Sequence, residues 1–127
     1  MLKKSFLLTL VCIMLFTTPL AAQDMIIQGY SDVFMSYEAS IGVYGSRIIC
    51  EAYSDLAGFY DASIEMKLQK YVNGSWVTLK SWYEETYGIA IGVVGGYNKS
   101  PGVYRTIATH KAGGETKYSY SPNFLVP

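Results

Sequence analysis

Cysteine and histidine, the side chains that most often carry out catalysis or bind metals, are scarce in this sequence. Its 127 residues include two cysteines and one histidine. Cys12 lies in an apolar N-terminal run, so Cys50 has no partner for an internal disulfide. Zinc sites and Ser/His/Asp or Cys/His catalytic sites need several such side chains at characteristic spacings, which do not occur here. We therefore expect no catalytic residue, no metal site and no cofactor, and a protein that is not an enzyme.

No apolar run is long enough to span a membrane as a helix, which takes about twenty residues. Residues 6–16 form a shorter apolar run that follows Lys3 and Lys4 and precedes small residues ending at Ala22. This order is that of a secretory signal peptide. We expect a signal peptide at residues 1–22 and a single domain at residues 23–127 that is secreted and released rather than tethered.

An excess of one charge is missing as well. Without Lys3 and Lys4, eight basic and ten acidic side chains remain, which is a net charge of −2. The sequence also has no basic stripe, so it gives no support for binding to nucleic acid or, in the mature form, to a membrane surface.

Helical periodicity is also missing, because no segment longer than six residues repeats apolar side chains at helical spacing. About seven segments instead alternate apolar and polar residues and are separated by turn formers. The expected strands are residues 34–39, 47–53, 64–72, 75–83, 87–97, 102–108 and 116–126. Residues 54–61 are expected to form a loop, and Pro122 to produce an edge or a bulge. The pattern predicts an all-β protein, a single antiparallel β-sandwich.

The clearest local signal is the hairpin at residues 64–83, whose strands meet at Asn73-Gly74. These two residues suit a type I′ turn, because both central positions of that turn need positive φ. A two-residue loop places Lys67 opposite Lys80 and Glu65 opposite Trp82. Ile64, Met66, Leu68, Val77 and Leu79 would then face the core. Because like charges repel across a strand pair, the face with both lysines should point to water.

Aromatic residues gather on that water-facing side. The candidate ligand-binding residues are Tyr71, Trp76 and Trp82 on the hairpin and Tyr118 and Tyr120 on the last strand. They suit either stacking on a glycan or anchoring a protein partner. The alternative is a structural role, as cross-strand pairs or as rings packed beneath a neighbouring loop. We expect a non-enzymatic binding module whose partner is an extracellular glycan or protein.

Two other functions stay open. The apolar, glycine-rich strand at residues 87–97, or the last strand at 116–126, could pair edge to edge with partner chains, giving a structural or assembly protein. His110 could serve a small hydrolase, although no nucleophile motif accompanies it. We expect His110 to be a solvent-exposed residue at a strand end, which makes the hydrolase the least favoured function.

Two segments resemble the immunoglobulin-like sandwich. Residues 47–52 resemble the strand that carries the first core cysteine, here Cys50, and residues 102–106 resemble the strand with the corner tyrosine, here Tyr104. The resemblance implies an immunoglobulin- or fibronectin-like topology in which Thr106 occupies the second cysteine position. It also implies that the Tyr104 hydroxyl bonds back to the backbone near the preceding turn.

The mature chain also resembles a group of small exported proteins of Gram-positive, clostridial-type bacteria. The similarity rests on Leu68-Gln69, on Asn73-Gly74-Ser75-Trp76, and on Pro101-Gly102-Val103-Tyr104-Arg105. This resemblance implies export and the β-sandwich fold, and it implies no site residues.

Overall fold

The computed structural model describes residues 31–127, so the expected signal peptide and its cleavage site lie outside the described residues. Residues 33–127 form one compact unit. Its six strands are β2 (Phe34–Tyr44), β3 (Arg47–Val72), β4 (Ser75–Asn98), β5 (Gly102–Ala112), β6 (Glu115–Tyr120) and β7 (Phe124–Val126). The prediction of an all-β protein is confirmed for these residues. None of them belongs to a helix long and apolar enough to cross a membrane.

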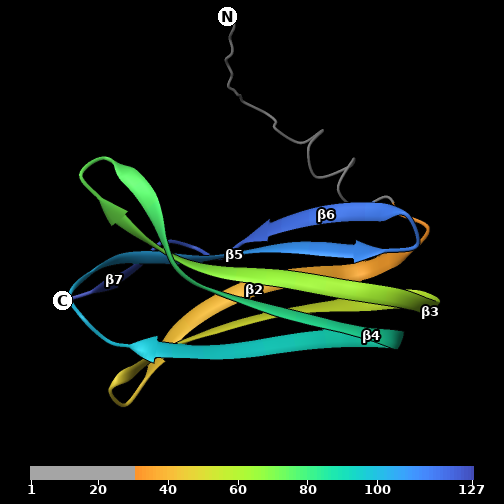
Figure 1. Ribbon diagram of the computed structural model, residues 1–127, viewed down its shortest axis with the longest axis horizontal. Helices are drawn as coiled ribbons and strands as arrows, with labels where there is room; N and C mark the ends of the chain where they lie inside the picture. The colour runs from red at the N-terminus through yellow and green to blue at the C-terminus, as the bar shows by residue number, and fades with distance from the viewer. Residues whose placement is uncertain (1–30) are drawn as a thin grey trace, which may run out of the picture. The chain divides into compact units, whose positions relative to one another are not determined.

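The strands form one antiparallel sheet that curls into two layers, because β3 and β4 make a long hairpin that folds back on itself (Figure 1). In the first layer, residues 47–55 of β3 lie between β2 and residues 90–98 of β4. In the second layer, residues 62–70 of β3 lie between β5 and the first half of β4, with β6 and β7 beyond β5. The regular pairing of β3 with β4 is interrupted between Asp55 and Tyr60.

Two breaks that the sequence predicted between strands are absent from the structure, and the reason is the same for both. Residues 54–61 continue β3 instead of forming a loop, and residues 84–86 continue β4 instead of ending it. Ser54 and Leu56 keep the inward alternation that began at Ile48, while Asp55 faces solvent. The polar and glycine residues that suggested a loop are therefore tolerated on the outer face of a strand.

The last predicted strand divides where proline interrupts it. β6 ends at Tyr120 and β7 begins at Phe124, so the chain leaves the strand around Pro122, where an edge or a bulge within a single strand was predicted. Ser121 maintains the connection, because its backbone N–H donates to the Thr106 carbonyl (2.8 Å) and its Oγ accepts from the Thr106 N–H (2.8 Å). Both segments remain hydrogen-bonded to β5.

Apolar side chains fill the space between the layers. The buried core comprises Val33, Phe34, Ala39, Ile48, Cys50, Ala52, Leu56, Ala62, Ile64, Met66, Leu68, Ile91, Val93, Tyr104, Ala108, Ala112 and Val126. Ile64, Met66 and Leu68 face this core as the alternation of the hairpin predicts. Each such side chain contributes about 1.5–3 kcal/mol by leaving water.

The two positions taken from the immunoglobulin resemblance meet inside this core. Cys50 lies beside Thr106, and burial raises the pKa of the Cys50 thiol while the Thr106 hydroxyl lowers it to a smaller extent. Tyr104 is fully buried and its hydroxyl donates to the Ser100 carbonyl at 2.7 Å, which confirms the predicted corner contact. The described residues show six strands in a curled sheet, whereas about seven were predicted.

Candidate functional site

One extra residue in β4 decides which side chains of the hairpin face solvent. The turn forms as predicted, with positive φ at Asn73 and Gly74, and Tyr71 pairs with Trp76. The register then shifts by one between Leu68 and Gln69, so that Met66 pairs with Trp82. Because side chains alternate between faces, a shift of one residue turns every later side chain to the other side.

The shift corrects two predictions. Lys67 pairs with Ser81 and Lys80 pairs with Leu68, so the two lysines are not opposite each other. Trp82 does not join the solvent-facing aromatic residues but packs partly buried against the core. Its ring lies over Gly95 of the first layer, where a Cβ atom would overlap it.

Four of the five predicted binding residues do come together. The solvent-facing side of the second layer, here called the outer surface, carries Tyr71, Trp76, Tyr118 and Tyr120. The register explains this arrangement, because Ile107 of β5 pairs with both Lys67 and Tyr120. Tyr71 is 49% exposed, and Tyr118 and Tyr120 are 62% and 61% exposed, whereas Trp76 is half-buried.

Arg105, which the sequence did not single out, links these aromatic residues. Its guanidinium carbon lies 4.3 Å from the centroid of the Trp76 ring and 5.3 Å from that of Tyr120. Tyr71 meets Trp76 edge to face, with ring centroids 5.2 Å apart. We call Tyr71, Trp76, Arg105 and Tyr120 the aromatic–arginine cluster. In the sequence, the alternation of β5 already indicates that the Arg105 side chain faces outward. Which residues surround Arg105 follows only from the register between β3 and β5.

Hydrogen bonds across three strands hold Arg105 in place. Its Nε–H donates to Gln69 Oε1 at 2.9 Å, and Gln69 Nε2 donates to Thr78 Oγ1 at 3.1 Å. Within residues 31–127 the terminal amino groups of Arg105 make no hydrogen bond or ion pair. These donors have the planar geometry that binds a carboxylate in a bidentate manner. The cluster therefore offers a fixed cation between aromatic rings.

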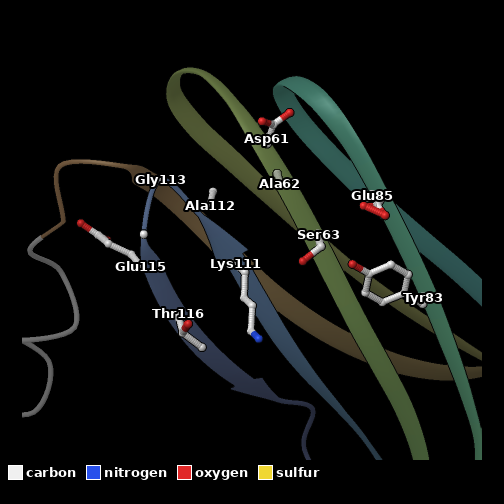
Figure 2. A pocket seen from close by; sticks show the side chains of 11 residues that line it. Asp61, Ala62, Ser63, Tyr83, Glu85, Lys111, Ala112, Gly113, Glu115 and Thr116 are labelled. Atoms are coloured by element: carbon white, nitrogen blue, oxygen red, sulfur yellow. The ribbon is translucent and has the colours of Figure 1, made fainter.

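The opposite end of the outer surface is a shallow polar pocket of about 380 Å³. Figure 2 shows Lys111 on β5, Asp61 and Ser63 on β3, and Tyr83 and Glu85 on β4 around this hollow. Carboxylates outnumber the single ammonium group, so the two ends of the outer surface differ in charge. No group of histidine, cysteine, aspartate and glutamate within the described residues could hold a metal ion.

The expectation of an exposed His110 is wrong. The side chain is fully buried, with Nδ1 2.8 Å from Ser54 Oγ and Nε2 2.7 Å from Ser119 Oγ. Burial lowers the pKa of His110 from 6.5 to about 4. The network ties β3 of the first layer to β5 and β6 of the second. Both ring nitrogens are occupied by serines, so the arrangement has no carboxylate to orient the imidazole as a catalytic triad requires.

Comparison with known proteins shows a distant structural likeness. No family model and no curated protein match the chain. The solution structure of CsgH from R. palustris is similar to this protein over 67% of this chain and 90% of the CsgH chain. The two have 12% sequence identity and a TM-score of 0.46. Neither the fold nor the function of this chain is inferred from that likeness.

Proposed function

We propose that this protein is an exported, non-catalytic binding module that recognises an extracellular protein through its outer surface. The observation that supports this proposal is the aromatic–arginine cluster, in which Arg105 lies between Trp76 and Tyr120 on a solvent-facing sheet. Tryptophan, tyrosine and arginine are the residues most enriched among the contacts that dominate protein interfaces. Side chains fixed before binding also lose less conformational entropy when the partner arrives.

The cluster favours a protein over a stacked sugar because little of the Trp76 ring is free. Arg105 covers it at 4.3 Å and Tyr71 approaches it edge-on at 5.2 Å. The exposed features are instead the Tyr71 and Tyr120 rings and the unpaired donors of Arg105. The matching partner surface has a carboxylate that reaches Arg105 and apolar or aromatic groups around it.

A glycan is the second candidate, and the polar pocket favours it. Tyr83 lies beside the hydroxyl, carboxylate and ammonium groups of Ser63, Glu85 and Lys111. An exposed aromatic ring next to such groups can stack on one face of a sugar while its hydroxyls are hydrogen-bonded. The candidates use opposite ends of the outer surface, so variants can separate them.

The experiment places a photo-crosslinking amino acid at Ile107, in the centre of the outer surface, and irradiates the full chain in a culture that produces it. We expect a protein adduct from this position. Trp76→Ala combined with Arg105→Ala should reduce its yield by at least about thirtyfold, because even one interface residue of this kind contributes about 2 kcal/mol or more. Tyr53→Ala combined with Arg47→Ala is the matched control, since these residues lie on the exposed face of the first layer.

The outcomes distinguish the candidates. An adduct that the Trp76 and Arg105 substitutions remove and the control keeps supports the protein partner. Retention of the chain on isolated cell-wall polysaccharide that Tyr83→Ala with Lys111→Ala abolishes supports the glycan instead. An adduct of equal yield in all variants, or from a crosslinker at Glu51 on the first layer, contradicts a role for the outer surface.

Export and ancestry are part of the same proposal. We propose that residues 1–22 direct secretion and are removed, and that the domain has an immunoglobulin- or fibronectin-like origin. The Tyr104–Ser100 contact and the position of Thr106 beside Cys50 support the second point. An origin among Gram-positive exported proteins is likewise proposed, from the segments around Trp76 and Tyr104. Mass spectrometry of the secreted chain tests the cleavage site, which we expect after Ala22.

A further inference from the structure

The unpaired edge of β4 differs in its two halves. β4 pairs with β3 along one side, and no strand within residues 31–127 pairs with its other side. The first half has the features that usually discourage edge pairing, namely the charges of Lys80, Glu84 and Glu85 and the bulge at Leu79. Residues 87–98 have no charge and no proline. This second half is thus an open sheet edge without the usual protection.

The side chains of this segment leave the edge accessible. Ile91 and Val93 are buried against the core, whereas Ala90, Gly92 and Val94 lie on the exposed face of the first layer. Gly92 leaves open space on that face, since a Cβ atom there would meet only the Ala52 carbonyl oxygen, at 3.7 Å. A strand can therefore approach without displacing a bulky side chain.

We infer that this edge pairs with the same edge of a second copy of the chain, in antiparallel orientation about Gly92. This register places Ile91 of one copy opposite Val93 of the other, so the buried faces of the two sheets join into one. It also places Ala90 opposite Val94 on the exposed face. A two-fold axis repeats each of these contacts, as the isologous interface of a dimer requires.

Charge selects the antiparallel orientation of a second copy. The paired segment is uncharged, so no like charges meet within it. Glu84 and Glu85 precede it and Lys99 follows it, so the antiparallel arrangement brings opposite charges toward each end. A parallel, in-register pair would instead bring Lys99 beside Lys99 and Glu85 beside Glu85. The dimer joins the first layers, and the outer surface of the second layer is not used.

Sedimentation velocity of the full chain, purified after export, tests the inference. We expect a reversible monomer–dimer equilibrium across a concentration series. Ala90→Lys with Val94→Lys puts like charges opposite each other at two symmetry-related positions and should raise the dimer dissociation constant about tenfold or more. The matched control is Ser40→Lys with Tyr44→Lys, which has the same spacing on the exposed face of β2, at the other edge of the first layer.

A charge-reversed pair keeps the test independent of folding defects. Ala90→Glu with Val94→Glu should weaken the dimer to a similar extent when it is alone, and an equimolar mixture with the lysine variant should recover dimers. Recovery requires that both variants fold and that positions 90 and 94 face each other. A wild-type chain that stays monomeric at all concentrations, a lysine variant that dimerises normally, or a mixture that stays monomeric would overturn the inference.

Discussion

Gly95→Ala should lower the free energy of unfolding by about 2 kcal/mol or more, as expected when a side chain is forced into a filled core. Gly95 does not adopt positive φ, so its backbone would accept alanine. The obstacle is the Trp82 ring, which occupies the position of the added Cβ atom. Urea unfolding of the variant and the wild type measures the difference.

Trp82→Ala provides the background that isolates this contact. Removing the indole should itself cost about 3 kcal/mol, because a large ring packed against the core leaves a cavity. In that background Gly95→Ala should be nearly neutral, because the clash has gone. The double-mutant cycle should therefore show a coupling of about 2 kcal/mol. Additive effects of the two substitutions would show that Trp82 does not lie over Gly95.

Lowering the pH from about 7 to about 4 should remove about 3 kcal/mol of stability through His110 alone. Burial holds the pKa of His110 at about 4, against 6.5 for the free side chain. Between these values the unfolded chain binds a proton at His110 and the folded chain does not. Unfolding is therefore favoured as the pH falls through this interval, and above pH 6.5 the effect of His110 is absent.

His110→Gln separates this effect from the titration of carboxylates. Glutamine is neutral at every pH of the series and can still hydrogen-bond to Ser54 or Ser119. Tyr37, whose ring centroid is 5.4 Å from that of His110, is unchanged in the variant. Urea unfolding of both proteins across the series should show a steeper loss of stability for the wild type. Parallel profiles would mean that His110 is not the buried neutral group described above.

The alternation of apolar residues was sufficient to predict the strands but not their lengths. Every predicted strand except the last falls within an observed one, because alternation reports burial on one face, whereas the strand predicted at residues 116–126 divides into β6 and β7. The loop predicted around Asp55 and Gly58 was wrong because polar residues and glycine are equally compatible with the exposed face of a strand. Sequence cannot show that β3 and β4 each pass from one layer to the other, since that depends on long-range pairing.

The binding surface was predicted only in part. The reason is that its residues come from strands whose register the sequence does not determine. Tyr71 and Trp76 are adjacent to the Asn73-Gly74 turn, which fixes their pairing locally. Trp82 lies beyond the bulge at Leu79. In the predicted register Leu79 faces the core, and in the observed register Trp82 does. The hydrophobic pattern fits both registers, so it could not reveal the shift. Arg105 joins the cluster through β5, a contact between distant parts of the chain.

Dependence on contacts between distant parts of the chain also explains why the prediction of an exposed His110 was wrong. Its position before the Lys111–Gly114 turn suggested exposure, yet it lies on the inward parity of β5, two residues from the buried Ala108 and Ala112. Ser54 and Ser119, from strands far apart in the sequence, supply the hydrogen bonds that make burial of the imidazole tolerable. The sequence of β5 alone does not predict those hydrogen-bond partners.

The central claim is that the register shift at Leu79 divides the two tryptophans, leaving Trp76 in the solvent-facing cluster and placing Trp82 in the core. Nuclear Overhauser effects in the isotope-labelled protein test it most directly. We predict contacts between the Trp82 ring protons and the Gly95 Hα protons, together with cross-strand contacts between Met66 and Trp82. Cross-strand contacts between Glu65 and Trp82 and between Lys67 and Lys80, with none from Trp82 to Gly95, would contradict it.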